Sequence, residues 1–181
     1  MNIMEENQKK ENSLWEFIKV VVISVAIVLP IRAYVAQPFI VSGASMEPNF
    51  HDGEYLIIDE LTYALRKPER GEVIVFRYPL NPSEFFIKRI VGLPGETVEI
   101  KNSKIFINGD VVSESFISAD IAKKTLPNLK TNLDENEYFV LGDNRPKSSD
   151  SRFWGALPKD KIMGRALLRL WPVAKAGFIN D

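Results

Sequence analysis

Three segments of the sequence combine nucleophilic or titratable side chains with glycine, proline or apolar residues. In the first, 42–48, glycine and proline favour a tight, exposed path that would present the hydroxyl of Ser45. In the second, 85–96, Lys88 lies among the apolar residues of an expected strand. The third, 141–155, is dense in short polar side chains and charges. A hydroxyl, an amine and a polar loop that fixes them are parts of nucleophilic catalysis, although the first and third segments, each taken alone, also fit ordinary turns.

Lys88 would act as a base only if its amine is buried. Burial disfavours the ammonium form and lowers a lysine pKa from about 10.4 toward neutral pH, so that the amine can accept a proton. An arginine in the same place would stay charged. Period-two alternation places Lys88 on one apolar face of the strand and Arg89 on the other, and does not decide which is buried. An outward Lys88 paired with a neighbouring acid remains the alternative.

The polar side chains of the third segment suit a loop with a fixed shape. Asp143, Asn144 and Ser148 can satisfy backbone groups of the loop. Asp150 and Arg152 are spaced to form a charge-assisted pair. We therefore expect a rigid polar loop directly after the strand that ends near residue 141.

Composition argues against several other chemistries. The chain has 181 residues and a formal net charge of −1, with bases spread among acids, so it shows no electrostatic footprint for nucleic acid. It has no cysteine, which removes disulfides and thiolate chemistry. His51 is the single histidine, whereas zinc sites usually draw on several His or Cys ligands. We expect no metal and no other cofactor, and a Ser-His-Asp triad would have to use His51.

The elements that must position these residues read mainly as strands. Beyond Pro38, short β-branched and aromatic runs alternate with Gly, Pro, Asn and Asp, which is typical of an antiparallel sheet. Asn108-Gly109 lies between two apolar runs in 104–112 and predicts a tight hairpin. The polar stretch 113–136 is expected to be an irregular, exposed excursion. The remaining expected strands are 54–58, 72–76, 86–91, 97–100, 138–141 and 165–170.

The amino-terminal region predicts a membrane anchor. Residues 1–13 are polar and read as a cytosolic tail, whereas 14–36 are mostly apolar over a length that approaches the bilayer core. The uncharged part, 20–31, is short enough to fit a signal-peptide core or a buried helix as well. No A-x-A pattern precedes a cleavage point, and basic residues favour the amino side, so we expect a retained anchor with residues 37–181 outside the cytoplasm.

Taken together, the three segments resemble the signatures of the bacterial type I signal peptidases, in kind and in order. Ser45 with Met46 and Pro48 is similar to the family's nucleophile segment, and Lys88-Arg89 followed by Gly-Leu-Pro-Gly-Glu at 92–96 is similar to its general-base segment. The third signature is matched by the Gly-Asp-Asn-Arg run at 142–145 and by Ser148, Asp150, Ser151, Arg152, Trp154 and Gly155.

The resemblance implies a role for each matching residue. Ser45 would be the nucleophile and Lys88 the general base, with Ser148 orienting the lysine. The scaffold of the site would be Arg89, Asp143, Asp150 and Arg152. The oxyanion would be held by the Ser45 backbone N–H, with Ser42 or Gly43 as further candidates. Substrate would lie extended along a strand edge, for which the candidates are Phe39, Ile40 and Val41.

It also implies a fold, a reaction and a location. We expect a mainly β fold, a compact antiparallel sheet or barrel-like catalytic domain with a single amino-terminal transmembrane helix. We expect a serine endopeptidase that removes signal peptides from exported preproteins through an acyl-enzyme. It would lie in the bacterial cytoplasmic membrane as a single-pass protein, with preproteins and the lipid bilayer as partners. Residues 101–137 would form the family's variable insertion in a short version.

Two departures from the family pattern are visible. The nucleophile segment reads Met-Glu-Pro-Asn-Phe instead of the usual Met-x-Pro-Thr-Leu, which is similar to the eukaryotic and archaeal branch, where histidine replaces lysine. Lys88-Arg89 favours the bacterial chemistry. Gly43 occupies the position where one branch has a serine whose hydroxyl helps to hold the oxyanion, so that hydroxyl is missing here.

Three alternatives remain open from the sequence. His51, six residues past Ser45, is a rival base. The self-cleaving LexA-type repressors share a Ser/Lys pair, but they need a DNA-binding module and an internal target, and neither is visible. A non-catalytic, membrane-tethered β module that binds exported peptides is the alternative outside enzymes.

Overall fold

The computed structural model describes residues 15–26, 37–114, 117 and 126–179. Residues 15–26 form a helix. No helix within these ranges combines the length and the apolar character that a membrane crossing requires. The predicted cytosolic tail, and the part of the predicted anchor at 14 and 27–36, lie outside the described residues.

The larger of two antiparallel sheets carries the segments that contain Ser45 and Lys88. Its hydrogen-bonded order is β1-β2-β11-β3-β4-β9-β10, and β12 pairs with β11. Within the described chain, β1 and β10 are the ends of this path, so the sheet is open and has β1 on one edge. The strands are β1 (Gln37–Ile40), β2 (Tyr55–Asp59), β3 (Val73–Tyr78), β4 (Asn81–Gly92), β9 (Glu137–Leu141), β10 (Leu157–Pro158), β11 (Ile162–Trp171) and β12 (Gly177–Phe178).

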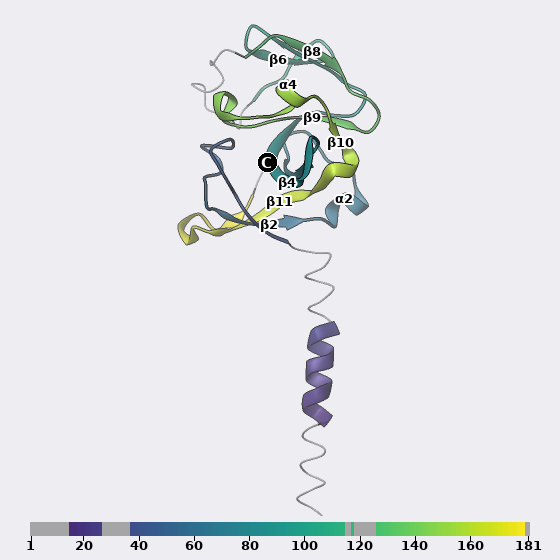
Figure 1. Cartoon of the computed structure of the whole chain (residues 1–181), viewed down its shortest axis with the longest axis vertical. Coiled ribbons are helices and arrows are strands. Elements are labelled where there is room, and N and C mark those ends of the chain that lie inside the picture. The colour runs from purple at the N-terminus through teal and green to yellow at the C-terminus, as the bar shows by residue number, and fades with distance from the viewer. Residues whose placement is uncertain (1–14, 27–36, 115–116, 118–125, 180–181) are drawn as a thin grey trace, which may run out of the picture.

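A smaller sheet in the order β7-β6-β5-β8 lies at the opposite end of the domain from β2 and β11 (Figure 1). The β6 to β7 hairpin turns at Asn108-Gly109, and both residues have positive φ angles, 53° and 97°. The predicted hairpin is therefore confirmed. The strands are β5 (Thr97–Lys101), β6 (Lys104–Ile107), β7 (Asp110–Val111) and β8 (Leu129–Asn132).

Short helices join the strands around the site. The turn after β9 contains the 3-10 helix η1 (Arg145–Lys147) and then α4 (Ser151–Trp154), which begins at the cap residue Asp150. The other helical turns are α2 (Thr62–Leu65), η2 (Lys159–Lys161) and η3 (Val173–Lys175).

Three hydrophobic clusters pack against β4 and its neighbours. One lies beneath the 41–50 segment and includes Met46, Phe50 and Ile87. Another contains Ile90 together with residues of β3 and β9. The last joins the smaller sheet to the larger one through Val91. Because successive β4 side chains enter different cores, both faces of this strand are buried around residues 87–91.

The mainly β, antiparallel character expected from the sequence is confirmed. The expected irregular stretch 113–136 is wrong in its last part, because β8 forms there and pairs with β5. The segment reads Leu-Lys-Thr-Asn, so it lacks the apolar residues that signal a strand in the sequence. Its exposure nevertheless alternates along the chain, as it does in a strand. The smaller sheet also begins at β5, before residue 101, and the insertion boundaries at 101 and 137 stay a prediction.

Candidate active site

The loop that carries Ser45 connects β1 to β2 and is closed at its base by backbone hydrogen bonds. The Val41 N–H donates to the Glu54 carbonyl and the Gly53 N–H donates to the Val41 carbonyl, both at 2.9 Å. Met46 is fully buried in the core beneath the loop. Ser45 precedes this anchor and stays partly exposed at the surface above it. The buried side chain of Met46 thus helps to fix the position of the Ser45 hydroxyl at the surface.

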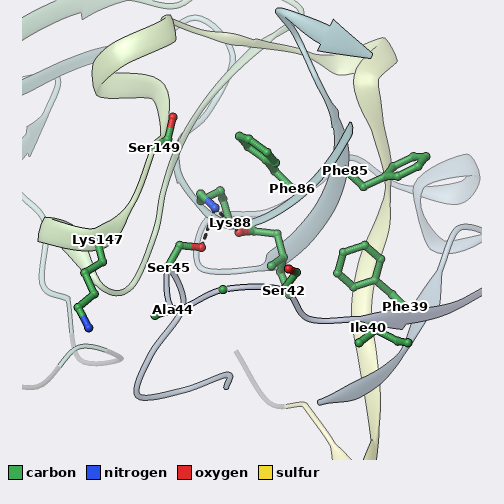
Figure 2. A pocket seen from close by; sticks show the side chains of 12 residues that line it. Phe39, Ile40, Ser42, Ala44, Ser45, Phe85, Phe86, Lys88, Lys147 and Ser149 are labelled. Atoms are coloured by element: carbon green, nitrogen blue, oxygen red, sulfur yellow. Dashed lines mark hydrogen bonds between the residues drawn. The ribbon is translucent and has the colours of Figure 1, made fainter. Parts of the chain in front are cut away.

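Lys88 reaches Ser45 from β4. Its side chain is 4% exposed, and Nζ donates hydrogen bonds to Ser45 Oγ and to the Ile87 carbonyl, each at 2.8 Å. Figure 2 shows the amine directed at the Ser45 hydroxyl, on the side of the strand where Phe86 lies. The Phe86 ring centre is 5.1 Å from Nζ. Of the two faces that periodicity left open, the lysine therefore takes one that is buried and that meets the hydroxyl.

Burial lowers the pKa of Lys88 from 10.5 to about 8, because an ammonium loses hydration in this environment. Asp150 and Asp143 act in the opposite direction at longer range. No carboxylate of the described ranges forms an ion pair with the amine. About a tenth of the molecules would carry a neutral amine at pH 7, and about half at pH 8. Such an amine can accept a proton from a neighbouring hydroxyl.

Arg89, the next residue, points into the opposite side of β4 and is paired. Its Nε and Nη2 donate to the two carboxylate oxygens of Asp143 at 2.9 and 2.8 Å, and Nη1 donates to the Gly71 carbonyl at 2.6 Å. Asn49 Nδ2 also donates to Asp143 at 2.8 Å. This buried pair connects β4 to the loop after β9 and to the loop that carries Ser45.

The segment after β9 packs directly on the nucleophile loop. The Asn144 N–H donates to the Ser45 carbonyl at 2.9 Å. A Cβ on Gly142 would lie 2.6 Å from the same carbonyl and 2.2 Å from Ser148 Oγ, so only glycine permits this approach. Ser148 is buried, and its Oγ has no hydrogen-bond partner among the described residues. The expected orienting serine therefore lies beside the Ser45 backbone with a hydroxyl that is still available.

The shape of this segment is fixed by Asp150 and Arg152. Arg152 Nε and Nη2 donate to Asp150 at 2.7 and 2.8 Å, and the Gly142 N–H donates to the same carboxylate at 3.0 Å. Arg152 Nη2 also donates to the Arg145 carbonyl at 2.7 Å. The charge-assisted pair expected from the sequence is present, and it closes the loop on itself.

A pocket of about 370 Å³ opens beside Ser45 and Lys88. Phe39 and Ile40 of β1 contribute to its wall, as expected (Figure 2). Val41 does not, and this expectation is wrong for its side chain, because alternation along the chain places it in the core, 1% exposed. Sequence reasoning missed further lining residues. Phe85 and Phe86 carried a signal, as aromatic neighbours of Lys88; the others include Lys147 and Ser149.

The backbone N–H groups near Ser45 differ in availability. The Gly43 N–H donates to Asp52 Oδ1 at 2.7 Å, so Gly43 is not free to act as an oxyanion donor in this structure. The tentative place of Gly43 in the oxyanion hole is therefore corrected. The Ser45 N–H has no acceptor within the described chain, which leaves it available.

His51, the rival base, lies elsewhere. Its Nδ1 lies 3.4 Å from Glu54 Oε1, and the imidazole lines a separate pocket that also contains Trp171 and Lys175. It is not among the residues that line the Ser45 pocket. The geometry at Ser45 thus favours Lys88 as its partner.

Comparison with known proteins agrees with this geometry. A sequence model of the family described as signal peptidase, peptidase S26, matches residues 14–171. A probable signal peptidase I-2 of Synechocystis sp. is 38% identical over 190 residues, which cover 99% of this chain and 86% of that protein. A signal peptidase I of Bacillus licheniformis is 34% identical over 176 residues, which cover 93% and 94% of the two chains.

A solved structure is similar as well. The crystal structure of a signal peptidase I from Enterococcus faecalis matches with a TM-score of 0.50 and 33% sequence identity, over 55% of this chain and 97% of that one. Both sequence relatives span nearly the whole chain, and the family match includes all three segments that resemble the signatures. The chain therefore belongs to the signal peptidases of peptidase family S26, serine endopeptidases that remove signal peptides from preproteins.

Proposed function

We propose that the chain is a membrane-bound serine endopeptidase that removes amino-terminal signal peptides from exported preproteins, with Ser45 as nucleophile and Lys88 as general base. The observation that carries this proposal is the 2.8 Å hydrogen bond between Lys88 Nζ and Ser45 Oγ. It joins a hydroxyl to an amine whose pKa burial lowers to about 8. A Ser/Lys pair of this kind needs no histidine to generate the nucleophile.

The first half of the reaction forms an acyl-enzyme. Neutral Lys88 takes the proton of the Ser45 hydroxyl while Oγ attacks the scissile carbonyl carbon, whose oxygen becomes an oxyanion. The Ser45 N–H stabilises that oxyanion. When the tetrahedral intermediate collapses, the carbon–nitrogen bond breaks and the ammonium of Lys88 gives its proton to the leaving amine. The signal peptide stays attached to Oγ as an ester, and Lys88 is neutral again.

The second half releases the signal peptide. Lys88 takes a proton from a water molecule that attacks the ester carbonyl, and a second oxyanion forms in the same place. Collapse breaks the bond to Oγ, which recovers its proton from Lys88. The signal peptide leaves with a free carboxyl group, and the enzyme returns to its starting state.

Other residues of the site would position the reacting pair. Ser148 would orient the lysine amine, and its buried hydroxyl without a partner supports this role. Asp143 and Arg89 would tie β4 to the Ser45 loop through the hydrogen bonds described above. Asp150 and Arg152 would hold the segment that contains Ser148.

Substrate would bind as an added strand on β1. That strand is an edge of the larger sheet, so its outer backbone groups can pair with an extended peptide. Phe39, Ile40 and Phe85 line the adjoining pocket and offer apolar contacts to small side chains before the cut. The scissile bond would then cross Ser45 at the polar end of the pocket.

Membrane attachment would come from residues 14–36, with 1–13 in the cytosol and 37–181 on the extracytoplasmic side of the bacterial cytoplasmic membrane. The apolar stretch in the sequence and its basic amino-terminal flank support this topology. The arrangement would place the lipid bilayer and membrane-bound preproteins next to the pocket. We likewise propose 37–181 as the bounds of the extracytoplasmic domain and 101–137 as the bounds of its insertion.

The direct test is cleavage of a purified preprotein in detergent by the full chain. Ser45→Ala and Lys88→Ala are each expected to abolish cleavage, because one removes the nucleophile and the other its base. Ser83→Ala and Lys104→Ala are matched controls on exposed positions away from the pocket, and both should cleave at the wild-type rate. Cleavage at the wild-type rate by either dyad variant would refute the assignment.

The rival base can be tested in the same assay. His51→Ala is expected to retain activity, because the imidazole faces Glu54 and not the Ser45 pocket. Loss of activity in a folded His51→Ala variant, together with activity in Lys88→Ala, would transfer the role of base to His51.

A further inference from the structure

The Gly43 N–H donates to the carboxylate of Asp52 across the loop that carries Ser45, with 2.7 Å between nitrogen and Oδ1. Gly43 lines the Ser45 pocket, whereas Asp52 does not. We propose that Asp52 is a positioning residue for the reaction, which fixes the backbone of Gly43 and thereby the orientation of Ser45 and its N–H. This inference rests on the proposed role of Ser45 as the nucleophile.

The backbone at Gly43 requires something to hold it. Its φ angle is +83°, in a region that residues with a side chain rarely adopt. A Cβ at this position would meet no atom within 4 Å, so packing does not impose the conformation. The hydrogen bond to a carboxylate is charge-assisted and is stronger than one to a neutral acceptor. Asp52 therefore selects one backbone conformation at a residue that has many.

Few other contacts restrain the backbone between the two buried anchors of the loop. Val41 is buried with both backbone groups bonded, and Met46 is buried in the core. Between them, the contacts are the Asp52 bond at Gly43, a 3.3 Å bond from the Glu47 N–H to the Ala44 carbonyl, and the bond from Asn144 to the Ser45 carbonyl. Release of Gly43 would leave the Ala44–Ser45 peptide, which carries the available Ser45 N–H, held only by the 3.3 Å bond at the Ala44 carbonyl.

Asp52 lies between two residues that are bonded to the sheet. Glu54, two residues later, is buried and forms an ion pair with Arg169 of β11 at 2.9 Å. Arg169 also donates to the Asn49 carbonyl at 2.7 Å and stacks over Phe50, with the guanidinium 5.0 Å from the ring centre. The returning arm of the loop is thus attached to the sheet on both sides of Asp52. The Asp52 carboxylate can therefore hold Gly43 in place without contacting the substrate.

The experiment compares Asp52→Ala with Asp52→Asn in the full chain, using a signal-peptide substrate in detergent. Asp52→Ala is expected to lower kcat about 10- to 100-fold with KM within twofold of wild type. The reason is that the Ser45 N–H stabilises the oxyanion of the transition state, which is not yet formed when substrate binds. Asp52→Asn keeps an acceptor oxygen and is expected to recover kcat to within about fivefold of wild type. Asp110→Ala, exposed on β7, is the matched control and should leave both constants unchanged.

A second variant changes Gly43, the other partner in the hydrogen bond with Asp52. Gly43→Ala disfavours the positive φ angle while Asp52 stays intact, and it is expected to lower kcat in the same way. Because both changes disturb one contact, the double variant should be no slower than the slower single variant. Gly43→Ala also keeps the proposal testable if Asp52→Ala does not fold.

The proposal is overturned if Asp52→Ala keeps the wild-type kcat, if folded Asp52→Asn is as slow as Asp52→Ala, or if the loss appears in KM alone. Ser45→Ala separates the two levels of inference in the same assay. An inactive Ser45→Ala beside a fully active Asp52→Ala rejects only the role of Asp52. An active Ser45→Ala rejects the proposed function itself.

Discussion

Lys88 and Arg89 are neighbours on β4 and both are 4% exposed, but their cationic groups meet different partners. Arg89 donates two hydrogen bonds to the carboxylate of Asp143, which compensates its charge. Lys88 meets a hydroxyl and a carbonyl, neither of which neutralises an ammonium. At equal burial, the chemistry of the cation and the partner that it meets together decide whether it becomes a structural link or a reactive base.

The largest expected effect comes from making Lys88 like its neighbour. Lys88→Arg places a guanidinium that stays charged beside Ser45, so no base remains, and we expect the cleavage rate to fall by at least about 10³-fold. The measurement is single-turnover cleavage of a preprotein at pH 8. Arg77→Lys, which alters an exposed cation of β3, is the control and should cleave normally. A Lys88→Arg variant within tenfold of wild type would show that a neutral amine is not required.

The converse change removes the pairing at Arg89. Arg89→Met leaves Asp143 buried with its charge largely uncompensated, and we expect the free energy of unfolding to fall by about 3–5 kcal/mol. Chemical denaturation at pH 7 measures this loss. Adding Asp143→Asn to Arg89→Met removes the stranded charge and should restore part of the stability. If the single and double variants are equally unstable, the pair does not hold the site by compensating charge.

The contrast between the two cations also marks the limit of what the sequence can predict. The β-branched runs, the Asn108-Gly109 hairpin and the pairing of Asp150 with Arg152 follow from local patterns, and the structure contains them. The buried face of β4 could not be chosen, because Ile87 and Ile90 enter separate cores and both faces are apolar. The chain alone does not show which cation will find a carboxylate.

Contacts between distant or irregular segments escaped prediction for a related reason. β8 has little apolar character and exists through its pairing with β5, about 30 residues earlier in the chain. The bond from Gly43 to Asp52 joins two turn residues that share no periodic pattern. The candidate nucleophile and base were recognisable by type and order, whereas the contacts that hold them depend on the folded loop.

A smaller effect tests the cost of burying Lys88. The pKa of this lysine is lowered on folding, from 10.5 to about 8, so the unfolded chain binds more protons between these values and stability rises with pH there. The full contribution is about 3 kcal/mol. Lys88→Met lacks this dependence, so it should be more stable relative to wild type at pH 7 than at pH 10. Lys104→Met, on an exposed site, should show no such change. A constant difference between wild type and Lys88→Met would mean that the amine is not desolvated.

The smallest expected effect is a displacement of the pH–rate profile by Asp150. For wild type, kcat/KM should rise with pH and level off above an apparent pKa of about 8, as Lys88 loses its proton. Asp150 raises the pKa of that lysine through its negative charge, so Asp150→Asn should move the rise to lower pH. The amide keeps an oxygen for the Gly142 N–H, which favours a folded variant. Asp160→Asn, exposed at η2, should leave the profile in place. A rise at unchanged or higher pH in folded Asp150→Asn would show that the carboxylate does not act on the lysine through its charge, and that Arg152 screens it completely.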